Sequence, residues 1–415
     1  MIRLAAILCA LGIILAGCGA ESAGGPVKLD WFIFNEPSGA PVRIAERCSQ
    51  ESGGRYDIEF RYLPSSADAQ REQLVRRLAA EDDTIDLIGM DIIWTGEFAN
   101  AGWIREVPGA IEQDLTGTVF DSVLASARFE DRLYAVPIWS NTQLLWYRTD
   151  RVDQPPGTWD EMLEQAERIG PQGRIEVQAD RYEGLTVWAN AMIHSAGTQI
   201  LSGPEELALE QGPTERALAL MGRVSREAAP PDVSTANEDS ARLGFESGDS
   251  SFMVNYPFVH PSAKQNAPEV FEHMGAALYP RVEPDLPSAP PLGGINLAVS
   301  SFSPHPDLAF EAITCLIQPQ NQLEIAESGG LPPVNRALYD RSEIERIYPG
   351  FSDLIKESIE AAEPRPAESP AYQDLSLAIQ RALHPTTGID PQNPTRTYER
   401  LRARVEQAVE RRGLL

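Results

Sequence analysis

The sequence has few cysteines, few histidines and no apolar run long enough to span a membrane. Its four cysteines and five histidines include no Cys-x-x-Cys and no His-Glu-x-x-His spacing, so we expect no metal and no cofactor. The apolar run Leu4–Leu15 is shorter than the about 20 residues of a membrane span. Basic residues are also scarce, 35 against 61 acidic ones, and the resulting net charge of −26 argues against nucleic acid and anionic lipid as partners.

The length and composition indicate a large folded chain. A length of 415 residues is enough for two or three domains. The hydrophobic content of 42% supplies real cores, and the acidic residues are spread along the whole chain. The charge therefore predicts an acidic surface and not an acidic tail.

The N-terminus has the pattern of an export signal. Arg3 precedes the apolar run, which ends in Leu15-Ala16-Gly17-Cys18. This resembles a bacterial lipobox, in which the cysteine takes a lipid and the signal is cut before it. We therefore expect a signal peptide over residues 1–17, lipidation of Cys18 and a tether over 18–26; an ordinary signal with a chance cysteine is the alternative.

The next part of the chain alternates strands and helices. Strands are expected at Val27–Asn35, Tyr56–Leu63 and Thr84–Met90, with helices at Pro41–Ser52 and Ala67–Ala80 between them. This order predicts parallel strands with right-handed crossovers and a ligand site beyond their carboxyl ends. Asn35, Glu36 and Asp91 fall at two such ends.

The stretch Asp131–Asp150 has two apolar, aromatic runs separated by Ser140-Asn141-Thr142-Gln143. It is either a strand pair with a polar turn, or a strand that leaves one core at Tyr134–Pro137 and enters a second at Leu144–Tyr147. In the second case the polar residues would lie at a ligand site between the cores.

Several later segments, taken in order, carry a family resemblance. They are Tyr134–Pro137, Thr158–Ala166, Phe252–Pro257, Gly293–Val299 and Gly329–Asn335. Together with the lipobox they resemble the extracellular solute-binding proteins of carbohydrate ABC importers (family 1). Phe34–Gly39, Gly89–Thr95 and Pro370–Ser376 resemble the trehalose-binding lipoproteins of actinobacteria.

The resemblance implies an α/β, two-lobed periplasmic-binding-protein-like fold of type II, with the ligand cleft between the lobes. It implies a first lobe over 27–137 and 297–347, and a second over 138–296 and 348–415. The tail from Tyr348 would be helical and pack on the second lobe. A helix is also expected at Phe120–Phe129, in the first lobe.

A neutral sugar needs polar side chains for its hydroxyls and an aromatic face for stacking. We expect these roles to fall to Asn35, Glu36, Asp91, Asn141, Glu238, Tyr256, Gly294 and Arg381; the last is carried by the resemblance alone. Simpler roles exist: a turn residue for Asn35, a helix cap for Asp91, a capping-box partner for Glu238, core for Tyr256 and a surface cation for Arg381. Trp94, Trp139 and Trp188 are expected in the core.

Cys48 and Cys315 would remain in an exported, oxidising compartment once Cys9 leaves with the signal and Cys18 is lipidated. They form either a disulfide, which we expect, or two separate buried thiols.

The sequence therefore predicts a monomeric receptor, lipid-anchored at the extracytoplasmic face of the membrane, and not an enzyme. It would deliver a di- or oligosaccharide, trehalose or a related α-glucoside, to permease subunits served by a separate ATPase. The rivals are an exported glycoside hydrolase, with Glu36, Asp91 and Glu238 as its carboxylates, and a structural lipoprotein.

Overall fold

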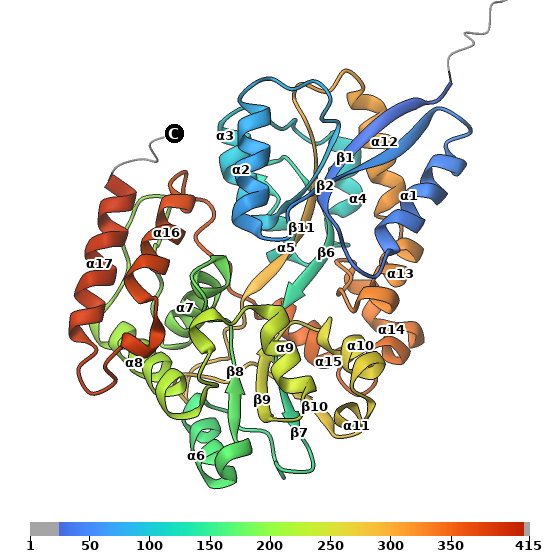
Figure 1. Cartoon of the computed structure of the whole chain (residues 1–415). Coiled ribbons are helices and arrows are strands. Elements are labelled where there is room, and N and C mark those ends of the chain that lie inside the picture. Colours follow the sequence, from blue (N-terminus) through green and yellow to red (C-terminus); the bar gives the residue numbers. More distant parts are fainter. Residues whose placement is uncertain (1–24, 411–415) are drawn as a thin grey trace, which may run out of the picture.

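The computed structural model describes residues 25–410, which form two lobes around separate β-sheets (Figure 1). The predicted signal peptide and Cys18 lie outside the described residues. Within 25–410, no helix combines the length and apolarity needed to cross a membrane, and no group of side chains could hold a metal ion. The two-lobed α/β fold expected from the sequence is confirmed.

The first lobe is built on a sheet with the strand order β2-β1-β3-β11-β6. β1 (Val27–Phe34) pairs in parallel with β2 (Tyr56–Leu63) and β3 (Leu87–Asp91), whereas β11 (Leu292–Val299) runs antiparallel to β3 and β6 (Val136–Thr142). The buried run Trp31-Phe32-Ile33 suits an inner strand that is covered on both faces. The other elements of this part are α1 (Ala40–Glu51), α2 (Ala67–Leu78), η1 (Ile92–Trp94), α3 (Thr95–Asn100), α4 (Gly109–Leu115), α5 (Asp121–Ala125), β4 (Arg128–Phe129), β5 (Arg132–Leu133), α12 (Pro306–Leu316), α13 (Pro319–Gly329) and η5 (Arg336–Asp340).

The second lobe is built on a sheet with the order β10-β7-β9-β8. The strands are β7 (Leu144–Arg148), β8 (Arg174–Glu176), β9 (Ser250–Asn255) and β10 (Met274–Ala277). Its helices are α6 (Trp159–Ile169), η2 (Gly170–Gln172), α7 (Glu183–Ser195), α8 (Gln211–Arg223), the π-helical η3 (Val224–Ala228), η4 (Val233–Thr235), α9 (Glu238–Glu246), α10 (Val259–Asn266), α11 (Pro268–Phe271), α16 (Tyr372–Leu383), η6 (Thr386–Gly388) and α17 (Thr395–Glu410). Thr158 caps α6 as its sequence position predicts, because its hydroxyl accepts from the backbone N–H of Glu161.

The chain passes from one sheet to the other at Gln143. β6 belongs to the first sheet and β7 to the second, so the predicted alternative of a strand pair with a polar turn is wrong. Our placement of the break was also wrong, since Ser140, Asn141 and Thr142 pair with β11 as part of β6. Their backbone groups complete the ladder, which leaves only the side chains available for other partners.

Two helical expectations need correction. The helix expected over Phe120–Phe129 ends at Ala125, because Glu130 and Asp131 take positive φ and turn the chain between β4 and β5. After α14 (Ser342–Ile347), α15 (Ser352–Glu360) buries Ile355 and Ile359 in the cluster that contains the first lobe's core, together with Trp146 and Met253 of the second sheet. Of the helices in this tail, only α16 and α17 pack with the second core.

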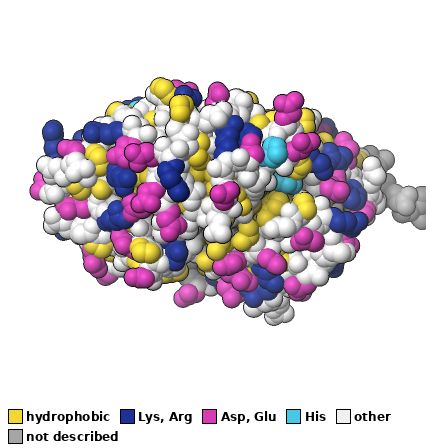
Figure 2. Space-filling view, turned by 90° about the horizontal axis from the view of Figure 1, so that it is seen from below, with side chains coloured by type: hydrophobic (Ala, Val, Ile, Leu, Met, Phe, Trp, Pro, Cys, Tyr) yellow, Lys and Arg dark blue, Asp and Glu magenta, His cyan; other side chains and the backbone are white. Residues whose placement is uncertain are grey.

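Cys48 of α1 and Cys315 of α12 form a disulfide with a Cα–Cα distance of 5.8 Å. The bond joins two helices of the first lobe that are 267 residues apart in the sequence. The acidic side chains are dispersed over the face seen in Figure 2, with basic side chains between them, as the sequence suggested.

Candidate functional site

Arg365 joins the two lobes through two carboxylates. Its Nη1 lies 2.7 Å from Oε1 of Glu183, at the start of α7, and its Nη2 lies 3.1 Å from Oδ1 of Asp91, at the end of β3. The arginine is only 5% exposed. A buried guanidinium requires such partners, because an isolated charge in the interior is very costly. Burial lowers the pKa of Arg365, but the neighbouring carboxylates reverse this and hold it above its usual range.

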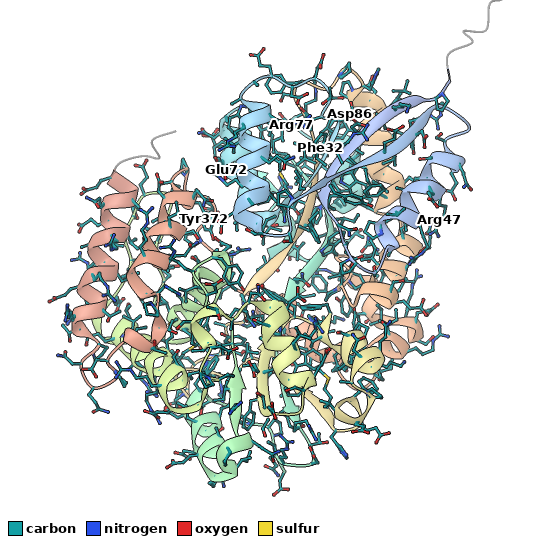
Figure 3. The ribbon with its side chains drawn as sticks, in the orientation of Figure 1. Phe32, Arg47, Glu72, Arg77, Asp86 and Tyr372 are labelled. Atoms are coloured by element: carbon teal, nitrogen blue, oxygen red, sulfur yellow. A yellow bond between two sulfur atoms is a disulfide. The ribbon has the colours of Figure 1, made fainter. Side chains whose placement is uncertain are left out.

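Glu183 is fixed by more than the arginine. Its carboxylate also accepts hydrogen bonds from the hydroxyl of Tyr372 and from Oγ of Ser376, the latter at 2.5 Å. Burial raises the pKa of Glu183, and Arg365, Ser376 and Tyr372 oppose that rise. Figure 3 shows Tyr372 at the end of α16 that faces α2 and the first lobe. The carboxylate therefore organises α7, α16 and the segment before α16 around one point.

Tyr256 and Glu238 form the second-lobe side of this site. Tyr256 follows β9, and burial raises the pKa of its hydroxyl, with Glu238 adding to the rise. Burial likewise raises the pKa of Glu238, which the Tyr182 hydroxyl beside it opposes. A Cβ at Gly184 would lie 2.2 Å from the Tyr182 hydroxyl, so a glycine is needed for this ring to fold back over α7.

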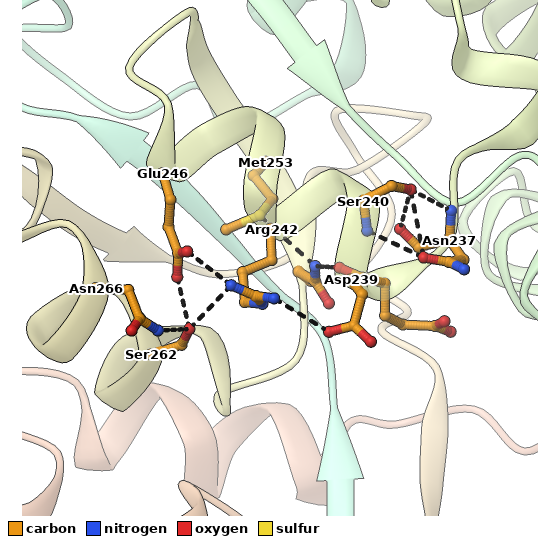
Figure 4. A network of polar contacts seen from close by, with 10 residues as sticks. Asn237, Asp239, Ser240, Arg242, Glu246, Met253, Ser262 and Asn266 are labelled. Carbon is orange, nitrogen blue, oxygen red and sulfur yellow. Dashed lines mark hydrogen bonds and ion pairs between the residues drawn. The ribbon is translucent and has the colours of Figure 1, made fainter. Parts of the chain in front are cut away.

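A polar network holds α9, and with it Glu238, in place (Figure 4). The Asn237 side chain and Ser240 form a capping box, so Glu238 is not the capping partner considered from the sequence. Asn255 of β9 donates to the backbone carbonyl of Glu238 at 2.9 Å. At the other end of α9, the carboxylate of Glu246 is contacted by Arg242 of the same helix and by Ser262 of α10. These contacts make Glu238 a positioned group and not a mobile surface carboxylate.

Asn141 lies on the first-lobe side, opposite Gly293 in the β6–β11 ladder. A Cβ at Gly293 would lie 3.3 Å from Cβ of Asn141 and 3.8 Å from the Tyr256 ring, which places the asparagine and the tyrosine on either side of this glycine. Gly294 has φ +138°, and a Cβ there would lie 2.5 Å from the carbonyl oxygen of Trp139. The strand pairing itself therefore requires a glycine at position 294.

Three buried polar atoms of this region have no hydrogen-bond partner among residues 25–410: Asn141 Oδ1, Asn190 Oδ1 and Arg365 Nε. Asn190 belongs to the region because its Nδ2 donates to the carbonyl of Pro364 at 3.3 Å. Unpaired polar atoms cost about 1–3 kcal/mol each, so they are uncommon unless a ligand or water uses them. The region combines hydrogen-bond acceptors, hydrogen-bond donors and tyrosine rings, and this combination suits a ligand rich in hydroxyl groups. We call the following residues the interlobe cluster: Asp91, Asn141, Tyr182, Glu183, Asn190, Glu238, Tyr256, Arg365 and Tyr372.

The structure brings together four of the eight residues proposed as ligand contacts, namely Asp91, Asn141, Glu238 and Tyr256, with Gly294 beside them in β11. Asp91 also caps η1, where its Oδ1 accepts from the backbone N–H of Ile93 at 3.2 Å. The Asp91 side chain thus serves both as a helix cap and as an ion-pair partner of Arg365.

The other three form no hydrogen bond or ion pair with the cluster among the described residues. Asn35 is exposed after β1, and the carboxylate of Glu36 accepts from the backbone and hydroxyl of Ser38. Arg381 is exposed on α16 and lines a groove with Arg404 of α17, so among the described residues it takes no part in the cluster. The tryptophans at 94, 139 and 188 are at most 2% exposed and belong to the core, as expected.

Sequence reasoning missed Tyr182, Glu183, Asn190, Arg365 and Tyr372. Arg365 stands between two prolines, within the tail that we expected to be helical. An arginine in a segment with no helical or strand periodicity was the available signal. A cavity of about 720 Å³ lies elsewhere, among α10, α13 and α14. Charged side chains such as Arg43, Lys264 and Glu327 share its lining with apolar ones, whereas the cluster has buried polar atoms without partners.

The family described as bacterial extracellular solute-binding protein matches residues 50–323. The chain belongs to this family. The family expected from the sequence is therefore confirmed.

Two curated relatives are similar to this chain. A probable ABC transporter-binding protein of Deinococcus radiodurans is 25% identical over 342 residues, which are 79% of this chain and 81% of the relative. The maltotriose-binding protein of Pyrococcus abyssi is 24% identical over 275 residues, 63% of this chain and 58% of the relative.

Solved structures of low sequence identity share the fold. Maltose-bound MalE3 of T. maritima has a TM-score of 0.82 and 24% identity, covering 92% of this chain and 99% of that one. The maltotriose-binding protein of Thermus thermophilus, bound to maltotriose, has a TM-score of 0.74 and 18% identity, covering 92% and 100%.

Proposed function

We propose that this solute-binding protein is the receptor of an ABC sugar importer and binds a di- or oligosaccharide, with trehalose or a related α-glucoside favoured. The observation that carries the proposal is the interlobe cluster, in which Arg365 holds one carboxylate from each lobe and several buried polar atoms lack protein partners. The maltose and maltotriose ligands of the relatives support a glucoside.

The binding step we propose is hinge closure. β6 and β11 belong to the first sheet and lead directly into the second lobe at Gln143 and Leu292, so they form the natural hinge. A sugar that contacts Asp91 and Asn141 on one side, and Glu238 and Tyr256 on the other, binds better when the lobes are closed. No cofactor or covalent step is needed, and we propose that the protein is not an enzyme.

The proposed setting is the extracytoplasmic face of the membrane. The lipobox-like Leu15–Cys18 supports removal of a signal peptide and lipidation of Cys18. Two acyl chains would hold the protein stably, since one chain gives only marginal binding. The monomeric receptor would then pass its sugar to the permease subunits, with a separate ATPase on the other side.

Isothermal calorimetry with trehalose, maltose, sucrose and maltotriose tests the proposal. We expect heat of binding with at least one of them and the tightest binding with trehalose. No heat with trehalose would remove trehalose from the proposal, and no heat with any of the four would remove the sugar-receptor function.

A second assay separates the receptor from a glycoside hydrolase. The protein is incubated with trehalose and with maltose, and free glucose is measured. We expect none above the blank; release at a catalytic rate would show that the carboxylates of the cluster do chemistry. A structural lipoprotein, by contrast, would neither bind nor change its radius of gyration when sugar is added.

A further inference from the structure

The C-terminal helix carries a row of arginines on one side. Arg396, Arg400 and Arg404 are exposed and spaced four residues apart, so they lie along one side of α17. Arg381 of the neighbouring α16 lines the same shallow groove as Arg404, with a volume of about 170 Å³. We call these four residues the arginine face.

The arginine face has no partner within the folded chain. None of its four guanidinium groups forms an ion pair with any residue that the structure describes, although acidic residues outnumber basic ones 61 to 35. Asp374 lines the same groove without pairing. Glu399 lies three residues after Arg396 and therefore beside it on α17, but the structure shows no ion pair between them, and Glu406 and Glu410 pair with none of the four arginines either.

Like charges four residues apart destabilise a helix. The effect is visible at Arg400, where burial and the charges of Arg396 and Arg404 together lower the pKa. Elsewhere on this lobe, the half-buried Arg216 and Arg223 are neutralised by Asp160. The folded chain thus contains a group of like charges whose mutual repulsion is unfavourable for its stability.

We propose that the arginine face contacts the anionic phosphate headgroups of the membrane surface. The row from Arg396 to Arg404 extends about 12 Å along the helix, which suits several phosphates in a plane better than one small ligand. Each arginine near an anionic bilayer contributes to binding. The net charge of −26 led us to exclude anionic lipid, but net charge describes the whole molecule, whereas attraction over a Debye length of about 8–10 Å depends on the local face.

The proposed anchor makes the contact geometrically feasible, and to that extent the inference rests on the proposed function. Eight residues separate Cys18 from Val27, so the nine steps of the tether span at most about 30 Å. In Figure 1, β1 starts at the upper right of the first lobe, and α17 forms the left edge of the second lobe. An acidic protein held this close to an anionic surface would be repelled in most orientations and attracted in the one that presents α17.

The test is cosedimentation of the chain from Glu21 onward, which retains every helix and strand described here, with vesicles of phosphatidylglycerol or phosphatidylcholine. We compare R396Q/R400Q/R404Q with R168Q/R341Q/R346Q, a control that removes the same charge from exposed arginines on α6 and near α14. Thermal denaturation verifies that both variants fold.

We expect the unmodified chain to bind phosphatidylglycerol and not phosphatidylcholine at about 0.1 M salt, and to lose binding at about 0.5 M salt. The arginine-face variant should bind about tenfold more weakly, and the control within about twofold of the unmodified chain. Equal loss in both variants, or no binding by the unmodified chain, overturns the proposal. Binding to polyglutamate without binding to vesicles would assign the face to an acidic polypeptide instead. Because no sugar is present, these outcomes are independent of the calorimetry.

Discussion

The Nη2 of Arg365 and the Oδ1 of Asp91 lie 3.1 Å apart although 274 residues separate them in the sequence. The same guanidinium holds Glu183 of the other lobe. One side chain thus links the end of a first-lobe strand to the start of a second-lobe helix.

Arg365→Ala should destabilise the protein by about 3–5 kcal/mol, because it leaves the Glu183 carboxylate buried without its counter-charge. Unfolding in urea measures this. The double variant Arg365→Met/Glu183→Gln removes both charges and should recover much of the loss. If the double variant is as unstable as the sum of the single ones, the two residues are not coupled and Arg365 contributes only packing.

Asn141→Ala should weaken sugar binding more than tenfold and leave the melting temperature of the sugar-free protein nearly unchanged, because Asn141 Oδ1 has no partner within residues 25–410. Calorimetry and thermal denaturation give the two numbers. Asn296→Ala is the matched control: its Nδ2 lies within hydrogen-bond distance of Thr95 and Ser126 in the first lobe, so it should lower the melting temperature without changing affinity. A large loss of stability in Asn141→Ala would show that its role is structural.

Glu176 should make stability fall as the pH rises. Its side chain is 5% exposed, and burial raises its pKa from 4.5 to about 7. The protonated form is thus favoured in the fold, and this stabilisation is complete below about pH 4.5 and is lost as the pH rises through 7. The full effect is about 3 kcal/mol.

Glu176→Gln should remove this part of the pH dependence and raise the melting temperature at pH 8, measured against the unmodified protein from about pH 5 to 8. Burial raises the pKa of Asp86 as well, so the difference between the two profiles is the quantity to compare. Glu399→Gln, on the exposed side of α17, should leave the profile unchanged. Parallel profiles for Glu176→Gln and the unmodified chain would contradict the assignment.

Gly294→Ala should destabilise the β6–β11 pairing by several kcal/mol, since a Cβ would approach the Trp139 carbonyl oxygen to 2.5 Å at φ +138°. Gly102→Ala is the control, because it has φ +72° but no atom within 4 Å of the added carbon, and it should cost only about 1 kcal/mol. Similar losses in the two variants would show that backbone strain alone, and not the close approach, makes position 294 a glycine. The comparison is by denaturant unfolding.

The sequence predicted the structural features that depend on residues close together in the chain. Strand β2 has the predicted bounds, because the alternation of apolar and polar residues over Tyr56–Leu63 lies within the segment itself. Asp91, Asn141, Glu238 and Tyr256 were accessible for a similar reason, since each stands at or next to the end of a predictable element or in a polar break within one.

The rest of the cluster depends on contacts between distant parts of the chain. Arg365 lies in a proline-flanked segment with no periodicity, and its role arises only when β3 and α7 meet there. The same limit explains Arg381, because its position on a helix did not distinguish a ligand contact from an exposed surface cation. It also explains α15, whose apolar side could pack on either lobe until the packing is known.

The disulfide between Cys48 and Cys315 encloses the whole second sheet within its loop. Each lobe also includes a segment from near the C-terminus of the chain. β11 and α12 complete the first lobe, and α16 and α17 complete the second. Neither half can therefore reach its final packing until most of the polypeptide is available. For the exported receptor proposed above, this order of segments would delay folding until export is nearly complete, which is the condition that a translocation channel for unfolded chains requires.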